Sequence, residues 1–347
     1  MTLAALKQIH DSHNAEWRDG RPAHYGSIEN EYRLLREACG WIDFSAAAKF
    51  RFTGEDRKSW LQGQVSNDMQ HLTDGGFVQF CILKPTGQII ADADLWALPD
   101  EYVAVVPGSQ REATLDRLEK MLILEDVAIQ DLSQDHGLIS VQGPEASRVL
   151  GERLPLPHLD AGTVELSGGA LRLMRQDCTG SGGWSLLFDE ASAPAVIGLL
   201  EGIRPVGFEA WQIARLECGI PLYGRDMNEK TLVMEMGAHF VESHVNLEKG
   251  CYTGQEVVMR IHSRGHTNRT WMGLKPESPV SPGDAVSHAT RDDVGKVTSS
   301  AVSPAFGPIA AATLRNVAAV ENESVIVQGP DGPVKAKVVR MPIRRIE

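Results

Sequence analysis

Two successive stretches of the chain repeat one order of strand-like and helix-like segments, and this repeat restricts the fold more than any other feature. In each copy a strand precedes a helix, a set of hairpin strands and a second helix. The expected strands are 49–54, 77–83, 88–98 and 101–107, then HGLISVQG, TVELSGGALRLMRQ and WSLLFDE. The expected helices are 55–72 and 111–124, then PEASRVLGERL and APAVIGLLEGI. Short connections favour antiparallel pairing, so we predict an α+β fold with mainly antiparallel sheets.

The C-terminal part of the chain has a different pattern of predicted secondary structure. FEAWQIARLECG (208–219) predicts a helix with Gly219 just past its end. From about residue 270, short β segments alternate with Pro, Gly and Asp, which is typical of a small barrel or sandwich. We therefore expect two α+β parts, over 1–135 and 136–268, and a C-terminal β-barrel over 269–347.

Composition excludes several classes of protein. The 34 Lys and Arg against 46 Asp and Glu give a net charge of −12, which disfavours coating of nucleic acid or anionic membrane. No apolar run approaches the roughly 18 residues of a membrane helix, and the first residues contain no signal-peptide pattern. The 5 cysteines are an odd number without a C-x-x-C pair, which indicates reduced thiols. We expect a soluble, cytoplasmic protein without a membrane partner.

Common catalytic signatures are absent from the sequence. It contains no GxGxxG, P-loop, HExxH or GxSxG motif, so nucleotide, zinc-protease and serine-hydrolase activities lose their main support. His262 and His266 are four residues apart, but Gly265 lies between them and no third ligand is near. We expect no metal site.

The sharpest local motif is KGCYTGQE (249–256). Thr253 and Glu256 have the spacing of a capping box, so a helix is expected to begin at Thr253. Cys251 would then lie at the positive end of this helix, near Lys249, and both would favour its thiolate. A reactive thiol and a small residue packed at a tight helix entry both remain open.

Two basic tracts stand out in this acidic chain. Segments 249–275 and 335–347 each carry five Lys or Arg residues against one Glu. They could bind an anionic tail, a phosphate or an RNA, although such runs more often form a solvated face.

The segments RLECGIPLYGRD (215–226) and KGCYTGQE together resemble the superfamily of the glycine-cleavage T-protein, the tetrahydrofolate-dependent aminomethyltransferase. The second motif is similar to that of its YgfZ-type folate-binding branch. The resemblance runs almost from end to end, through GWIDFS, LQGQVSND, ISVQGPEASRVL and VGKVTSSAVSPAFGPIA. It implies two α+β domains and a β-barrel arranged as a cloverleaf around a central folate-binding opening.

The resemblance also implies roles for individual residues. Glu217 matches the carboxylate that accepts two hydrogen bonds from the pterin of folate. Tyr223 and Lys249 are further folate-binding candidates, and the cofactor would be tetrahydrofolate or a one-carbon derivative. Asp92 falls where the aminomethyltransferases place a carboxylate near the reacting folate nitrogen, although a solvent-facing residue on a strand is equally expected there. Asp92 and Cys251 are the catalytic candidates.

Two departures from the T-protein disfavour aminomethyl transfer. A Y-T-G-E stretch of that family reads Cys178-Thr179-Gly180-Ser181, and Asn246 stands where it supplies an arginine to the folate. The first hypothesis is therefore a folate-binding accessory protein that supports iron–sulfur assembly or repair and, through such enzymes, tRNA modification. Its partners would be iron–sulfur client or assembly proteins, with tRNA bound only indirectly or weakly.

Two other hypotheses remain open, and with them the question of whether the chain is an enzyme. One is a tetrahydrofolate-dependent aminomethyltransferase. The other is an RNA-binding module that uses the basic tracts, which lack the neighbouring aromatic residues of a stacking motif.

Overall fold

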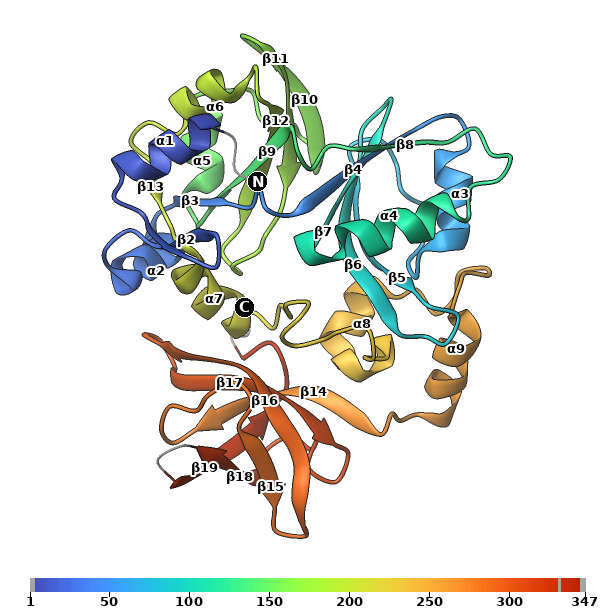
Figure 1. Ribbon diagram of the computed structural model, residues 1–347, viewed down its shortest axis with the longest axis vertical. Helices are drawn as coiled ribbons and strands as arrows, with labels where there is room; N and C mark the ends of the chain where they lie inside the picture. Colours follow the sequence, from blue (N-terminus) through green and yellow to red (C-terminus); the bar gives the residue numbers. More distant parts are fainter. Residues whose placement is uncertain (1–3, 330–331, 344–347) are drawn as a thin grey trace. The chain divides into compact units, whose positions relative to one another are not determined.

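The computed structural model describes residues 4–329 and 332–343, and the chain divides into two compact units (Figure 1). The first unit comprises Met1–Phe80 and Asp92–Trp211, and the second comprises Cys81–Ala91 and Gln212–Glu347. Both helices and sheets contribute to the fold, and a closed barrel occupies the C-terminal part. The predicted α+β class with a C-terminal β-barrel is confirmed.

One sheet of the first unit has the strand order β10-β11-β12-β9-β3-β13. Its strands are β3 (Gly40–Asp43), β9 (His136–Gln142), β10 (Ala161–Leu166), β11 (Gly169–Arg175), β12 (Gly183–Asp189) and β13 (Arg204–Pro205). The associated elements are α1 (Ala4–Ser12), β1 (Glu16–Arg18), β2 (Arg21–His24), α2 (Ile28–Glu37), α5 (Ala146–Gly151) and α6 (Ala193–Leu199). Neighbouring strands pair antiparallel except β13, which runs parallel to β3.

A second sheet has the order β5-β6-β7-β4-β8. Its strands are β4 (Ala48–Thr53), β5 (Phe77–Leu83), β6 (Ile89–Ala97), β7 (Tyr102–Val106) and β8 (Ala128–Asp131). The helical segments beside it are α3 (Arg57–Gln64), η1 (Gly108–Gln110) and α4 (Arg111–Glu119), and Figure 1 shows α4 along β6 and β7. The tip of the β5–β6 hairpin, Cys81–Ala91, belongs to the second unit.

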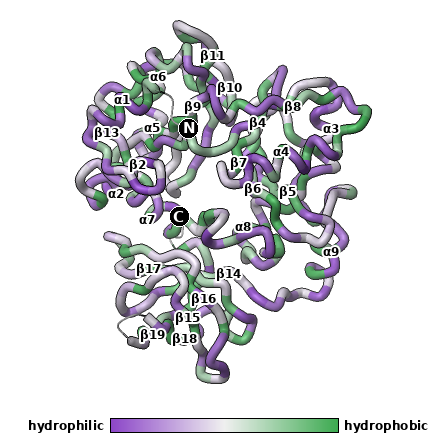
Figure 2. The backbone as a smooth tube through the Cα atoms, in the orientation of Figure 1, coloured by the Kyte–Doolittle hydropathy of each residue, from purple (hydrophilic) through white to green (hydrophobic). Residues whose placement is uncertain are grey.

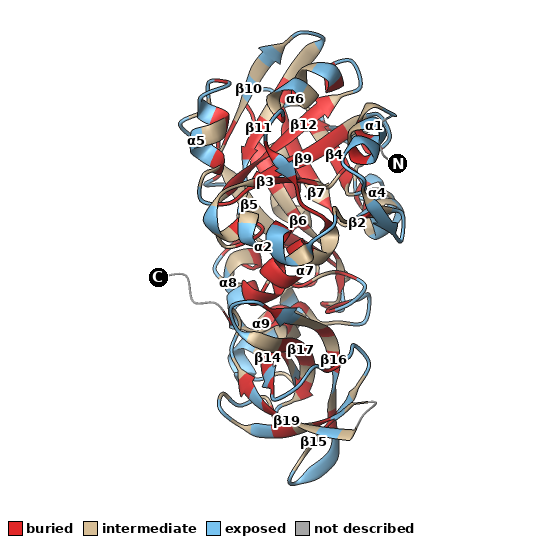
Figure 3. Ribbon diagram, turned by 90° about the vertical axis from the view of Figure 1, so that its left-hand side faces the viewer, coloured by how far each residue is buried: buried red, intermediate tan, exposed pale blue. Residues whose placement is uncertain are grey.

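The core of the first unit is built from large apolar side chains. Strands β9 and β12 are buried along almost their whole length (Figure 3), because one face of the sheet packs with α1, α5 and α6 and the other with strands of the second sheet. Trp96 stacks at a tilt on Phe77, and its indole N–H donates to the carbonyl of Arg175 at 3.0 Å. This bond joins the second sheet to the end of β11 and holds the two sheets of the unit together.

The second unit contains the C-terminal barrel and the helices before it. The helical elements are α7 (Phe208–Glu217), which enters this unit at Gln212, then η2 (Val233–Met236), α8 (Ala238–His244) and α9 (Gln255–Arg264). The barrel strands are β14 (Arg269–Pro276), β15 (Ala285–His288), β16 (Arg291–Ser303), β17 (Gly307–Arg315), β18 (Ser324–Gly329) and β19 (Gly332–Val339). The barrel closes because β14 pairs with both β17 and β19.

Several predicted helices differ from those observed. The helices expected over 144–154 and 193–203 extend only over Ala146–Gly151 and Ala193–Leu199. The helix expected over 55–72 ends at Gln64; Val65, Met69 and Leu72 are buried, but in irregular chain. The helix expected over 111–124 ends at Glu119. The helix expected from Thr253 begins at Gln255. Apolar spacing marked the buried positions correctly in 55–72, but buried loop residues produce the same spacing as a helix face.

Hydropathy along the chain changes over short distances, as the green and purple stretches of Figure 2 show. Within 4–329 and 332–343, none of the helices is long and apolar enough to span a membrane.

Candidate functional site

Asp92 and Asp94 lie on the same face of β6. Exposure alternates along this strand, so residues two apart share a side. The carboxylate of Asp94 accepts from Gln79 Nε2 at 2.8 Å and from Gln176 Nε2 at 2.6 Å. Asp92 Oδ1 is buried and, among the described residues, has no hydrogen-bond partner. Burial, with a smaller effect from the charge of Asp94, raises the pKa of Asp92 to about 7.

Glu217 is fully buried at the C-terminal end of α7. Ser303 at the end of β16 donates its hydroxyl to Glu217 Oε1 at 2.6 Å. The hydroxyl oxygen of Ser303 itself accepts the N–H groups of Ala305 and Phe306, each at 3.0 Å. With its oxygen occupied in this way, Ser303 has its single proton directed at Glu217. A buried carboxylate at a helix C-terminus is unfavourable for the helix, so its presence needs a compensating role.

The KGCYTGQE motif forms a tight entry to α9. Asn246 Oδ1 accepts the N–H groups of Glu248 and Lys249 at 2.8 and 2.9 Å and fixes the turn before Cys251. Gly254 precedes α9 with φ of 88°, and a Cβ there would lie 2.8 Å from the carbonyl oxygen of Lys84. Only glycine satisfies both conditions.

The predicted capping box at Thr253 is wrong. The N-cap of α9 is Gly254, which has no side chain to accept the first helical N–H groups. The left-handed turn at Gly254 displaces the start of the helix beyond Thr253. Cys251 therefore stands three residues before the N-cap, and its side chain is exposed.

Lys249 and the two tyrosines of the motifs pack together in the second unit. Lys249 is only 8% exposed, and its ammonium lies 5.0 Å from the centroid of the Tyr252 ring. Tyr252 and Tyr223 belong to one apolar cluster. The Tyr223 hydroxyl donates to the carbonyl of Ile89 at 3.3 Å. The Tyr252 hydroxyl is buried without a hydrogen-bond partner in the described parts of the chain, and burial raises its pKa to about 12.

The five predicted site residues fall in both units. Asp92 lies in the first unit, while Glu217, Tyr223, Lys249 and Cys251 lie in the second. Sequence analysis missed Asp94 and Ser303. The period of two along a strand was a usable signal for Asp94, because it repeats the acidic residue on the same face. Ser303 carried no signal, since it is 86 positions from Glu217 in the sequence.

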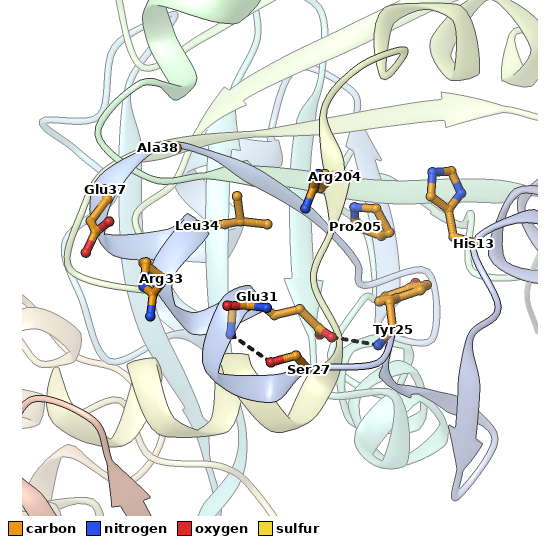
Figure 4. A pocket seen from close by; sticks show the side chains of 11 residues that line it. His13, Tyr25, Ser27, Glu31, Arg33, Leu34, Glu37, Ala38, Arg204 and Pro205 are labelled. Carbon is orange, nitrogen blue, oxygen red and sulfur yellow. Dashed lines mark hydrogen bonds between the residues drawn. The ribbon is translucent and has the colours of Figure 1, made fainter.

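A pocket of about 590 Å³ in the first unit contains none of the predicted site residues (Figure 4). Its lining includes His13, Tyr25, Ser27, Glu31, Arg33 and Arg204. Ser27 already caps α2 by accepting the N–H of Asn30, and Glu31 accepts the N–H groups of Tyr25 and Gly207. The side chains of Ser27 and Glu31 are therefore used to hold the fold.

A metal site is not formed by the residues that the structure describes. Within these residues, no group of three or more His, Cys, Asp and Glu side chains is placed to hold an ion. His262 lies on α9, and His266 follows the glycine that ends it.

The basic tract 335–347 includes Arg344, Arg345 and Glu347, which lie outside the described residues. RNA binding by the two basic tracts stays a prediction.

Comparison with known proteins assigns nearly the whole chain. Residues 6–246 match the family described as the GCVT N-terminal domain, and residues 269–343 match the glycine cleavage T-protein C-terminal barrel domain. An aminomethyltransferase of Chloroherpeton thalassium is 27% identical over 363 residues, covering 99% of this chain and 98% of that protein. An aminomethyltransferase of Staphylococcus carnosus is 29% identical over 332 residues, covering 92% and 90%.

A solved structure shares the fold. The glycine cleavage system aminomethyltransferase T from Bartonella henselae matches with a TM-score of 0.90, covering 99% of this chain and 98% of that chain at 22% identity.

These findings correct the first hypothesis, an accessory protein for iron–sulfur assembly and tRNA modification, which is wrong: several relatives that match nine-tenths or more of the chain are named aminomethyltransferase. The two departures that favoured it have local structural roles. The hydroxyl of Ser181 accepts a hydrogen bond from the Arg36 guanidinium at 3.0 Å, and Asn246 fixes the turn before Cys251. Changes with such structural roles are a poor guide to the reaction.

Proposed function

Because the chain belongs to the family of the glycine cleavage T-protein, we propose that it is a tetrahydrofolate-dependent aminomethyltransferase. The observation that carries the proposal is Asp92. It matches the position of the carboxylate that aminomethyltransferases place near the reacting nitrogen, and one of its oxygens is buried without a partner. A buried polar atom without a partner is costly, which supports a ligand as its missing partner.

Tetrahydrofolate fits the donors and acceptors of these residues. The pterin ring presents two adjacent N–H donors, and Glu217 is a buried carboxylate of the kind that accepts such a pair of donors. We assign Glu217 to pterin binding. The folate, when bound, supplies the nitrogen that accepts the one-carbon unit.

Asp92 is assigned to proton transfer. A carboxyl group with a pKa of about 7 is populated in both its acid and its base form near neutral pH, so it can take up a proton and return it. Its Oδ1 is the atom that would hold this proton.

The remaining candidates are assigned by their chemistry. Lys249 supplies positive charge that would attract the carboxylates of a folate tail, and Tyr223 supplies an aromatic surface. Cys251 is retained as a catalytic candidate because its thiol is exposed. The KGCYTGQE motif supports placing the chain in the YgfZ-type branch of the superfamily, and we propose this branch as its position.

The proposal is tested with purified protein, tetrahydrofolate and an aminomethyl donor. Release of ammonia together with methylenetetrahydrofolate is expected, and Asp92→Asn should lower the rate while retaining folate binding. Cys251→Ser decides whether the thiol takes part, since serine has nearly the same shape but stays protonated. Folded protein that binds tetrahydrofolate without any ammonia release would overturn the assignment as a transferase.

A further inference from the structure

We propose that Asp94 is a positioning residue that keeps the proton of an aspartate pair on Asp92. The proposal rests on one observation: the two aspartates on this face of β6 receive different numbers of hydrogen bonds. Asp94 receives two amide donors, whereas Asp92 Oδ1 receives none within the described residues. The role rests on the proposed function, because Asp92 is the residue through which Asp94 would act.

The two amides stabilise the ionised form of Asp94. Gln79 on β5 donates to Oδ1 and Gln176, which follows β11, donates to Oδ2. Burial raises the pKa of Asp94, and the two amide hydrogen bonds, one to each oxygen, oppose this rise because they favour the charged form. Two neighbouring carboxylates out of water are not both ionised at low cost, so the pair retains one proton. It belongs on Asp92, which has a single backbone hydrogen bond against the two amide donors of Asp94.

The amide of Gln176 is held in the donating orientation by its surroundings. The hydroxyl of Ser185 on β12 donates to Gln176 Oε1, which leaves Nε2 facing Asp94. Gln142 on β9 is fixed in turn, because its Oε1 accepts the backbone N–H of Cys178 at 3.1 Å and its Nε2 donates to the carbonyl of Gln176 at 2.7 Å. A backbone donor and a backbone acceptor cannot be exchanged, so they define which way the Gln142 amide points.

The charged and titratable surroundings of the pair are simple. From its own strand Asp92 faces Asp94, and β5 and the segment after β11 contribute the neutral Gln79 and Gln176. Cys178 is also titratable. Burial raises the pKa of its thiol, and the charge of Asp94 contributes to this rise, so the thiol is uncharged at neutral pH. Asp94 therefore supplies the charge that acts on Asp92.

The consequence is a carboxylic acid at the position where the family has its reacting carboxylate. With Asp94 ionised, Asp92 carries a proton up to neutral pH and can donate it to a ligand that faces Oδ1. Without the charge of Asp94, Asp92 would lose its proton at lower pH, although burial would still raise its pKa.

Carbon-13 NMR of aspartate carboxyl groups tests this in the full chain without any ligand. In the native protein, one aspartate should titrate near neutral pH, and its signal should be missing from Asp92→Asn. Asp94→Asn should lower the pKa of Asp92, by less than burial raises it. Asp189→Asn, which changes another aspartate of the first unit, is the control and should leave the Asp92 titration unaltered.

Two results would overturn the proposal. One is a near-neutral signal that persists in Asp92→Asn, since the proton would then reside elsewhere, for example on Asp94 with Gln176 reversed. The other is an unchanged Asp92 pKa in Asp94→Asn. If Asp94→Asn does not fold, the native protein and Asp92→Asn still decide the first point.

The pH profile of transfer activity separates this inference from the proposed function. If both hold, the midpoint of the profile should move to lower pH in Asp94→Asn. An altered Asp92 titration in a protein that transfers nothing to folate would overturn the function and leave the positioning role. Transfer by a protein whose Asp92 titrates at ordinary acidic pH would do the reverse.

Discussion

The guanidinium of Arg215 and the carboxylate of Asp226 lie 2.6 Å apart, with side chains 1% and 0% exposed. Asp226 also accepts the N–H of Leu222 at 2.9 Å and the hydroxyl of Thr298 on β16 at 2.6 Å. The pair thus ties α7 to the barrel. In the motif R-L-E-x-G-x-x-L-Y-G-x-D, the Arg and the Asp serve the fold, while Glu217 between them accepts a hydrogen bond from Ser303.

Removing one partner of this ion pair should be strongly destabilising. Asp226→Asn leaves the buried guanidinium of Arg215 without its counter-charge, and such a change costs about 3–5 kcal/mol. Urea unfolding of the full-length protein measures the loss of free energy of unfolding.

A surface pair provides the control for this prediction. Arg148 on α5 bonds to Glu145 and Glu152, but all three side chains are exposed, so Arg148→Ala should cost less than about 1 kcal/mol. Equal losses in Asp226→Asn and Arg148→Ala would show that burial does not decide the strength of the Arg215–Asp226 pair.

Glu217→Gln should weaken tetrahydrofolate binding by about 1.5–3 kcal/mol, the range for a hydrogen bond to a charged group. Glutamine keeps one acceptor for Ser303 but cannot accept two bonds from the pterin. Titration calorimetry under anaerobic conditions measures the affinity.

Glu235→Gln is the matched control for the folate measurement. Glu235 is a partly buried carboxylate of the second unit, and its Oε2 accepts the N–H of Leu232 at 3.2 Å. Its replacement should leave the affinity unchanged. An affinity that Glu217→Gln does not alter would remove Glu217 from the site.

Stability should fall as pH rises through the titration of Asp92. Its pKa is raised from 3.8 to about 7 in the folded protein, so between these values the folded state binds more protons than the unfolded state. The stability that this proton contributes is complete below pH 4 and lost above pH 7. Asp92→Asn removes the effect and should gain on the order of 2 kcal/mol relative to the native protein at pH 8, but little at pH 4.

Guanidinium unfolding of both proteins at the two pH values measures this difference. A gain from Asp92→Asn that is the same at pH 4 and pH 8 would contradict the raised pKa.

Much of the fold followed from local patterns. The alternation of residues along 88–98 predicted β6 correctly. Gly219 was predicted to lie just past the end of α7, and it does so with a φ of 68°. Such features depend on the residues beside them, which is why the sequence carries them. The start of α9 did not follow, because a left-handed Gly254 in contact range of Lys84 decided it, and that contact is non-local.

The site was predictable to the extent that its residues stand in motifs. Glu217, Tyr223, Lys249 and Cys251 were named from two segments of sequence, and whether they act in the proposed way remains to be tested. The partners that set their chemistry come from distant strands, as Ser303 does for Glu217. Contacts of this kind form only when distant segments pack together, so they could not be predicted from local sequence patterns.

Iodoacetamide should modify Cys251 before any other cysteine. Cys251 is exposed, Cys39 is half-buried, and Cys81, Cys178 and Cys218 are buried. Burial also raises the pKa of the Cys39 and Cys178 thiols, which lowers their thiolate fraction, the form that reacts. Peptide mass spectrometry after short exposure to the reagent gives the order of modification.

The variant Cys251→Ser tests, in the same labelling experiment, whether the rapid reaction belongs to the exposed thiol. Because the side chain is exposed and serine is nearly isosteric, the variant should keep its free energy of unfolding and its affinity for tetrahydrofolate, while rapid labelling disappears. Cys39 is the internal control, since its half-buried thiol should react slowly and equally in both proteins. Two results would contradict this prediction: rapid labelling that persists in Cys251→Ser, or labelling of Cys39 before Cys251. Either result would show that Cys251 is not the most accessible thiol. It would also remove the main reason for retaining Cys251 as a catalytic candidate.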